Sequence, residues 1–508
     1  MSFESSAFLH PRALVIGGGF GGIAAALRLK AKGYQVTLVD RCPRLGGRAQ
    51  VFERDGFRHD AGPTVITAPF LFDELFALFG LNRADYIEFL PLNPWYRFEF
   101  FNGDYFNYGG KVEDTVNEIR RFAPEDESGY LKLLVSSQRI FEIGFTQLAD
   151  QPFHHLSTLL RQVPRLLCLR SHRSVWQLVC AHLKDERLRR VFSIQPLLLG
   201  GNPLTTTSIY SLIHYLECRD GVYFARGGIG AVVDALAGLL DRTGVTVRLE
   251  TTVVSIRVHN GTAVGARLEN GEELDADIVV SDADPLHVYT RLLPGAQQSL
   301  ACRLKVARSR LSMGVFVLFF GSRKSYPHVA QHTVWLGQRY RGLLEDIFEN
   351  RRLADDFSLY VHRPTATDPS FAPPGQDAFY ALAPVPNLLA DIDWAVEGPK
   401  LRERIIGSLE RTLLPGVREH LVSDFYMTPK DFESRYLSVA GAGFSIAPLF
   451  RQSAWFRFHN RAEGPRNLYL VGAGTHPGAG LPGVLSSAKV LDRLVPIVPG
   501  ARDFSVRP

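Results

Sequence analysis

The feature that most constrains the fold of this chain is the stretch at residues 13–40, ALVIGGGFGGIAAALRLKAKGYQVTLVD. A short apolar run ends in glycines, a helix-forming segment follows and stops at Gly33, and a β-branched, alternating run ends at Asp40. Strand, glycine turn, helix and strand in this order predict a βαβ unit at the start of the chain.

The glycine turn has the spacing G-x-G-x-x-G, met by Gly17, Gly19 and Gly22. The first glycine allows a tight turn, the second lets the backbone approach a pyrophosphate, and the third lets the helix pack closely on the strand. Asp40 ends the next strand, where a carboxylate accepts hydrogen bonds from ribose hydroxyls and disfavours a 2′-phosphate. The pattern predicts a dinucleotide site.

Two later blocks carry the same kind of pattern. Residues 228–244 read as a helix, residues 259–262 (HNGT) as a hairpin turn, and residues 277–283 as a buried parallel strand. Residues 467–474 (NLYLVGAG) repeat the strand that runs into glycine. We therefore expect one discontinuous α/β domain, with two insertions. The predicted boundaries are 1–102, 221–293 and 441–508 for the cofactor domain, 103–220 for a helical part, and 294–440 for a substrate part with aromatic strands.

The composition excludes several classes of protein. The 508 residues exceed one ordinary hydrophobic core, and a net charge of +5 is too small to indicate nucleic acid binding. Five scattered cysteines, without a C-x-x-C pair, favour a reducing compartment and argue against a metal site. The N-terminus lacks the pattern of a secretory signal, and the longest apolar run, residues 313–321, is too short to span a bilayer.

Further segments make the chain resemble a known family. The G-G-R at residues 46–48 and the late G-A-G are typical of the flavin amine oxidase superfamily. The resemblance narrows to the bacterial phytoene desaturases of carotenoid biosynthesis and extends over residues 13–489. The segments that carry it are DAGPTVI (60–66), LLLGGNP (197–203), GAGFSIAP (441–448), QSAWFRFHN (452–460) and LYLVGAGTHPGAGLPGV (468–484).

The resemblance implies a Rossmann-like FAD-binding domain with an inserted mixed-sheet substrate domain and a helical subdomain. It also implies an FAD-dependent enzyme that introduces successive double bonds into a forty-carbon polyene, from 15-cis-phytoene towards neurosporene or lycopene. Asp40 stands where most relatives have Glu, and the carboxylate is kept. The residues that the resemblance places at FAD are Gly17, Gly19, Phe20, Gly22, Asp40, Arg41, Gly47, Arg48, Pro63, Thr64, Val253, Gly472, Gly474, Pro482, Gly483 and Val484.

The implied reaction removes a hydride and a proton from neighbouring carbons, and the flavin N5 accepts the hydride. The sequence does not identify the group that takes the proton, because no acid or histidine stands in a general-base motif. Arg161 resembles an arginine near the family's substrate cavity, and the alternative is that it is one of several surface arginines on this segment. His476 is left unassigned, as a residue of the late glycine loop.

A hydrocarbon substrate dissolves in the bilayer, so we expect a peripheral enzyme at the cytoplasmic face of the cell membrane. Residues 151–191 contain eight Lys and Arg against two acids, a local net charge of +6. A helical leucine face there would suit an anionic membrane, and an ordinary helix packed on its own core fits as well. Quinone or oxygen is the expected electron acceptor, and the oligomeric state stays open. The six residues of this leucine face are Leu156, Leu159, Leu160, Val163, Leu166 and Leu167.

Three other functions remain open at this point. An amine oxidase shares the FAD segments and differs in its substrate cavity. A polyene isomerase or saturase would use the flavin without net oxidation, or in the reverse direction. A prenyl-lipid carrier without catalytic activity uses the same fold without FAD, but the complete glycine motif with Asp40 argues against it.

Overall fold

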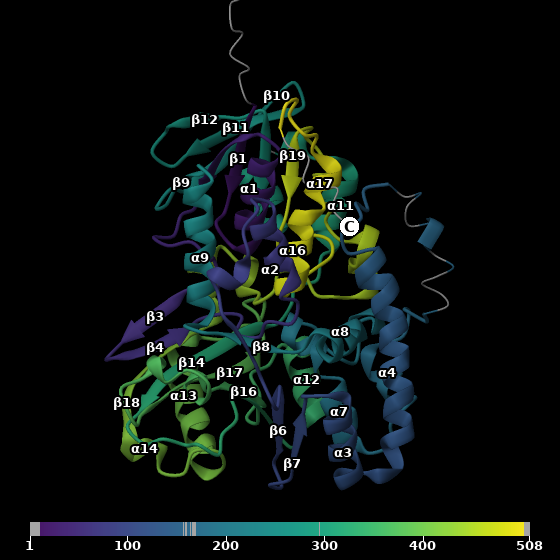
Figure 1. Ribbon diagram of the computed structural model, residues 1–508, viewed down its shortest axis with the longest axis vertical. Helices are drawn as coiled ribbons and strands as arrows, with labels where there is room; N and C mark the ends of the chain where they lie inside the picture. Colours follow the sequence, from purple (N-terminus) through teal and green to yellow (C-terminus); the bar gives the residue numbers. More distant parts are fainter. Residues whose placement is uncertain are drawn as a thin grey trace, which may run out of the picture.

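The computed structural model describes residues 11–155, 157, 160–162, 164, 169–293 and 295–501. Its first layer is a sheet of five strands that are parallel throughout (Figure 1). Three separated parts of the chain supply these strands, as the sequence predicts. In spatial order the strands are β19 (Leu468–Leu470), β13 (Ile278–Ser281), β1 (Arg12–Ile16), β2 (Gln35–Val39) and β9 (Thr246–Arg248).

Both faces of this parallel sheet are covered. On one face, α1 (Phe20–Ala31) packs between α16 (Leu481–Lys489) and α9 (Gly228–Arg242), around a core that includes Val15 and Leu38. The other face is covered by an antiparallel sheet whose core contacts include Leu14 and Val39. The strands of this small sheet are β10 (Val253–His259), β11 (Thr262–Leu268) and β12 (Glu273–Asp275).

A second, larger sheet lies at the opposite end of the molecule (Figure 1). It is antiparallel except where β15 runs parallel to β6. In spatial order its strands are β18 (Leu421–Met427), β14 (Gly314–Ser322), β17 (Asp377–Val385), β16 (Leu359–His362), β15 (His332–Leu336), β6 (Tyr96–Phe100) and β7 (Tyr105–Tyr108).

Strand β14, between β18 and β17, contains the longest apolar run of the sequence, and its side chains alternate between two cores. Phe316 and Leu318 pack towards α13 (Trp394–Arg411), whereas Val315, Val317 and Phe319 pack on the opposite face. A strand buried on both faces needs no polar residue, which explains why this run is apolar without spanning a membrane. Within the part of the chain that the structure describes, no helix is long and apolar enough to cross a bilayer.

Several helices lie along one side of the molecule, on the right in Figure 1. The main ones are α3 (Val112–Phe122), α4 (Glu127–Phe141), α6 (Val175–Cys180), α7 (Glu186–Phe192) and α8 (Leu212–Asp220). Helix α3 contacts the edge strand β7 of the large sheet. Smaller elements connect the layers. They are β3 (Val51–Arg54), β4 (Phe57–Asp60), α2 (Phe70–Ala77), β5 (Phe89–Pro91), β8 (Tyr223–Ala225), α10 (Pro285–His287), α11 (Leu300–Arg308), α12 (Tyr340–Phe348), α14 (Val417–His420), α15 (Pro429–Tyr436) and α17 (Leu491–Leu494).

Most predicted elements are confirmed, among them the first βαβ unit, the helix at 228–242, the hairpin between β10 and β11, and the strands β13 and β19. One predicted boundary is displaced. Residue 102 was expected to end the first domain, but β6 pairs with β15 and therefore belongs to the large sheet. Chain connectivity conceals this pairing, because its partner strand lies more than 200 residues away. The rest of the domain division stays a prediction.

The predicted leucine face falls almost entirely outside the described residues. Leu160 is the one member that the structure describes, and its side chain is 62% exposed. The amphipathic helix therefore stays a prediction.

Candidate functional site

The glycine turn between β1 and α1 is built for close packing. Gly17 has a φ of +98°, a conformation that favours glycine, and a Cβ on Gly22 would lie 1.8 Å from the carbonyl oxygen of Gly17. No side chain caps the start of α1, and its first turn contains no acidic residue. The uncapped start of α1 and the positive end of its helix dipole make this turn suitable for an anion.

Asp40 follows β2 at the carboxyl end of the parallel sheet. Its Oδ2 accepts a hydrogen bond from the N–H of Gly18 at 2.5 Å, and its Oδ1 accepts one from the N–H of Cys42 at 2.7 Å. These bonds fix the carboxylate, which lines a cavity. A carboxylate has lone pairs for about four hydrogen bonds, so Asp40 retains acceptors for two ribose hydroxyls.

Asp282, at the end of β13, is a site residue that the sequence analysis missed. Its side chain lies so close to the turn that a Cβ on Gly19 would approach Oδ2 to 2.5 Å. Burial raises the pKa of Asp282 to about 7, although N–H groups of Gly22 and Gly19 favour its charged form. Ligands of open α/β sheets bind beyond the carboxyl ends of strands, so the position after this predicted strand was the available signal.

The late glycine loop reaches the same place from the other end of the chain. A Cβ on Gly472 would lie 2.4 Å from Asp282 Oδ1, and Gly472 has a φ of +95°. The side chain of Arg457, which is almost completely buried, holds the loop in place. Its guanidinium donates to the carbonyl oxygens of Ala473 at 2.6 Å and Thr475 at 2.9 Å. The loop then enters α16, whose first turn also faces the cavity.

One large cavity connects these elements with the second sheet. The volume open to the centre of a water molecule is about 600 Å³, and the wall is mostly apolar. Fourteen of the predicted cofactor residues line it. They are Gly17, Gly19, Phe20, Asp40, Arg41, Gly47, Arg48, Pro63, Thr64, Val253, Gly474, Pro482, Gly483 and Val484.

Three predicted residues do not line the cavity. Gly22 and Gly472 lie directly behind its wall, where each makes a close backbone contact possible. Arg161 is exposed and is not part of the wall, so its role near the substrate stays a prediction. Arg48 donates to Ser438 Oγ at 2.6 Å, and burial lowers the pKa of its guanidinium.

Thr64 belongs to a buried polar group on the cavity wall. Its Oγ1 lies 2.9 Å from the hydroxyl of Tyr360 and 3.1 Å from that of Tyr380, on neighbouring strands of the large sheet. The Tyr360 hydroxyl also lies 2.7 Å from His332 Nδ1. Burial lowers the pKa of His332 to about 3, so this histidine is neutral. The tyrosines therefore hold the segment that contains Thr64 against the second sheet.

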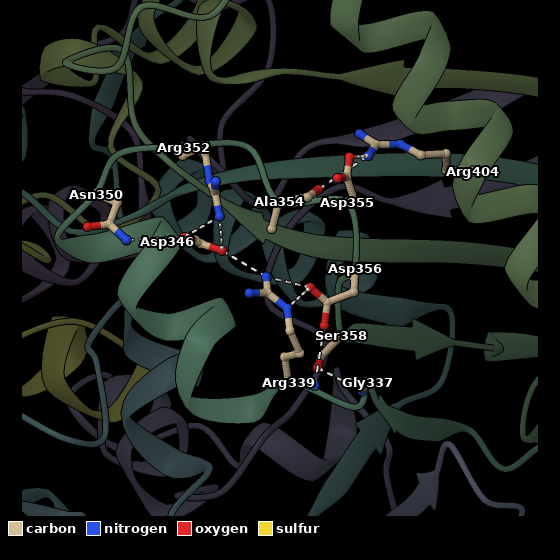
Figure 2. A network of polar contacts seen from close by, with 10 residues as sticks. All are labelled: Gly337, Arg339, Asp346, Asn350, Arg352, Ala354, Asp355, Asp356, Ser358 and Arg404. Atoms are coloured by element: carbon tan, nitrogen blue, oxygen red, sulfur yellow. Dashed lines mark hydrogen bonds and ion pairs between the residues drawn. The ribbon is translucent and has the colours of Figure 1, made fainter.

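The cavity wall also includes α12, which a loop connects to β16. Figure 2 shows the ion pairs that hold this loop against α12. Arg339 contacts Asp346 and Asp356, each at 2.8 Å, and Arg352 contacts Asp346 at 3.0 Å. Arg339 is the first cause of a lowered Asp346 pKa, which is about 2. The network positions Tyr340, which lines the cavity from α12.

Comparison with known proteins identifies the family. Residues 20–490 match the flavin containing amine oxidoreductase family. The chain belongs to this family. Members of it include relatives that are very similar over almost their whole length. A phytoene desaturase (lycopene-forming) of Pseudescherichia vulneris is 45% identical, covering 95% of this chain and 99% of the relative. A phytoene desaturase (neurosporene-forming) of Cereibacter sphaeroides is 43% identical, covering 97% and 96%.

These relatives confirm the resemblance inferred from the sequence motifs. Solved structures agree with the fold. An oxidoreductase from Methanosarcina mazei superimposes with a TM-score of 0.65 at 17% identity, covering 95% of this chain and 99% of that one. The predicted fold class, an α/β flavin-binding domain with a mixed-sheet insertion, is therefore confirmed.

As a member of the flavin containing amine oxidoreductase family, the chain is an FAD-dependent oxidoreductase. The wall fits this cofactor: an uncapped helix N-terminus offers N–H groups to the pyrophosphate, and Asp40 offers acceptors to the ribose. Helix α16, which also begins without a side-chain cap, and the late glycine loop line the same cavity. They would border the remaining part of the FAD molecule. Among the described residues, no group of three or more His, Cys, Asp or Glu is arranged to hold a metal ion.

Proposed function

We propose that this protein is a phytoene desaturase, which introduces successive double bonds into a forty-carbon polyene. The identity of 43–45% to phytoene desaturases over at least 94% of the chain carries the proposal. These relatives form lycopene or neurosporene, so both products are candidates for this chain.

The cavity supports a hydrocarbon as substrate. Apolar side chains of both insertions form a large part of its wall. Examples are Leu197, Leu216, Val317, Leu343 and Leu382. Such a wall makes dispersion contacts with a polyene and leaves no polar group without a hydrogen-bond partner when the hydrocarbon binds. It also excludes water from the carbons that react.

The roles of the chain's own residues follow from their places on the wall. The glycine turn and Asp40 would hold the nucleotide part of FAD, with Arg41, Gly47, Arg48 and Val253 beside it. Pro63, Thr64, Gly474 and the start of α16 would lie near the flavin. When bound, FAD would be the oxidant that accepts a hydride. The protein orients the polyene, keeps it dry and removes the accompanying proton.

A membrane-dissolved substrate supports docking on a membrane surface, and we place the enzyme at the cytoplasmic face of the cell membrane. Residues 151–191, with a local net charge of +6, are the part of the chain that suits an anionic surface. Arg161 belongs to this segment. The final electron acceptor is oxygen or a quinone.

The test uses the purified full-length protein, FAD and liposomes that contain 15-cis-phytoene. We expect coloured polyenes, and chromatography of the extracted products counts the double bonds introduced. Unchanged phytoene in the presence of bound flavin would refute the assignment. Release of hydrogen peroxide from amines by the same preparation would instead favour an amine oxidase.

A further inference from the structure

A carboxylate on the cavity wall has no role in holding FAD. Glu217 lies on α8, is 1% exposed, and lines the cavity together with its neighbours Ile213 and Leu216. The other α8 residues on the wall, Leu212, Ile213 and Leu216, are apolar. A hydrocarbon offers no hydrogen-bonding group, so substrate binding gives no reason for an acid at this position. Burying an acid costs free energy, and such groups concentrate at functional sites.

Glu217 is held by two tyrosines from the large sheet. The hydroxyl of Tyr96, on β6, donates to Oε1 at 3.2 Å, and the hydroxyl of Tyr108, on β7, donates to Oε2 at 2.9 Å. Tyr96 itself lines the cavity, and its ring lies 5.8 Å from the ring of His332. The carboxyl group is thus fixed between α8 and the edge of the second sheet.

This arrangement can accommodate both protonation states of the acid. The Tyr108 hydroxyl also lies 2.7 Å from His214 Nδ1, so it has a partner on each side. It can donate to the carboxylate, or accept from the protonated carboxyl group while it donates to the histidine. Glu217 therefore keeps a hydrogen-bond partner whether or not it carries a proton.

The surroundings give Glu217 a high affinity for a proton. Burial raises its pKa to about 8, and the two tyrosine hydroxyls oppose this shift only in part. No positive charge faces it, because burial lowers the pKa of His214 to about 4. The remaining titratable groups close to it are Cys218 on the same helix and Tyr130 on α4, and burial raises the pKa of each.

Other acids and histidines on the wall are less suitable. Asp40, Asp282, Asp284 and His287 follow strands of the parallel sheet, at the nucleotide end. His476 lies in the late glycine loop, and burial lowers its pKa to about 4. Burial therefore makes His476 a weaker proton acceptor than Glu217.

We propose that Glu217 accepts the proton released in each desaturation, with Tyr96 and Tyr108 as positioning residues. The inference rests on the proposed function. A hydride leaves one substrate carbon for FAD, and the C–H bond of the neighbouring carbon breaks. The electron pair of that bond forms the new double bond, and its proton forms an O–H bond with the Glu217 carboxylate.

The test measures the bleaching of bound flavin by phytoene in single turnovers without oxygen, as a function of pH. The wild-type rate is expected to rise about tenfold per pH unit and to level off near pH 8, because the base must be ionised. Glu217→Gln keeps the size and polarity of the side chain but cannot take the proton. We expect its rate to fall by about 10²-fold or more and to lose the pH dependence. Glu217→Asp, which keeps a carboxyl group, restores the pH dependence at a reduced rate.

Asp60→Asn is the matched control. Burial raises the pKa of Asp60 to about 6, but this carboxyl group accepts from the N–H of Ile229 at the start of α9 and does not line the cavity. Its pH profile should equal that of the wild type. FAD content and thermal stability, measured for every variant, separate a lost proton acceptor from a damaged fold.

A second measurement needs no substrate. At neutral pH the infrared spectrum should contain a carboxylic acid band that is missing in Glu217→Gln. A Glu217→Gln enzyme that binds FAD and bleaches at the wild-type rate and pH profile overturns the inference and leaves the proposed function intact. A wild-type flavin that phytoene does not bleach overturns both.

Discussion

Replacement of Gly22 by alanine tests whether close packing of the glycine turn creates the FAD site. The new Cβ would lie 1.8 Å from the carbonyl oxygen of Gly17, whereas real Cβ atoms do not approach closer than about 3.0 Å. The start of α1 and the end of β1 must therefore separate by about 1.2 Å. The oxygen is a backbone atom, and the position of a Cβ is fixed by the backbone. A change of side-chain rotamer therefore cannot relieve the contact.

The magnitude follows from hydrogen-bond geometry. An N–H···O bond of about 2.9 Å that lengthens by about 1 Å is no longer a hydrogen bond. Each charge-assisted bond to the pyrophosphate contributes roughly 1.5–3 kcal/mol, so the loss of one lowers FAD affinity by roughly 10–150-fold. The forced overpacking should also lower the free energy of unfolding by about 1–3 kcal/mol.

Titration of the apoprotein with FAD, followed by quenching of flavin fluorescence, measures the affinity, and urea unfolding measures stability. Gly238→Ala is the matched control, since this glycine lies exposed in α9 with nothing within 4 Å of its Cβ position. The control should bind FAD normally and gain up to about 1 kcal/mol from helix propensity. A Gly22→Ala protein that binds FAD with wild-type affinity would show that the turn does not hold the pyrophosphate.

Three further predictions follow. Asp40→Ala should weaken FAD binding by roughly 10–100-fold, because the ribose hydroxyls lose their acceptor, while Asp40→Glu should retain most of the affinity. Equal affinity of Asp40→Ala and the wild type for FAD in the fluorescence titration would disprove this role. Arg457→Ala removes the donors to two carbonyl groups of the late glycine loop. We therefore expect the free energy of unfolding in urea to fall by about 2–4 kcal/mol and FAD to bind more weakly. A variant that is as stable as the wild type and retains FAD would contradict this prediction. Arg339→Ala should cost about 1 kcal/mol at pH 7. Since Arg339 holds the folded-state pKa of Asp346 at about 2, below its ordinary value of 3.8, this stabilisation is present above pH 4 and disappears as the pH falls towards 2. Unfolding curves of both proteins should therefore converge at pH 2–3, and a constant difference would argue against the ion pairs as its source.

The elements that the sequence predicted share a local cause. A strand that runs into glycine has the same pattern at residues 13–19 and 468–474, and the NG turn at residues 260–261 specifies its hairpin without distant contacts. Fourteen of the cofactor residues that the family resemblance implies line the cavity, and those in the glycine turn and the late glycine loop lie in such local motifs. The Rossmann-like sheet and the general location of its ligand site could thus be inferred before any coordinates.

Tertiary structure alone decided which polar side chains meet where the cavity wall reaches the large sheet. Tyr96, Tyr108 and Glu217 come from two adjacent strands and a helix more than 100 residues later, and no spacing in the sequence connects them. Thr64 meets Tyr360 and Tyr380 in the same way, across 296 and 316 residues. The pairing of β6 with β15 brings these groups together, and strand pairing depends on which buried faces fit each other in the folded chain. Local sequence therefore predicted which part of the cavity wall would hold the cofactor, while the polar groups elsewhere on the wall depend on long-range packing.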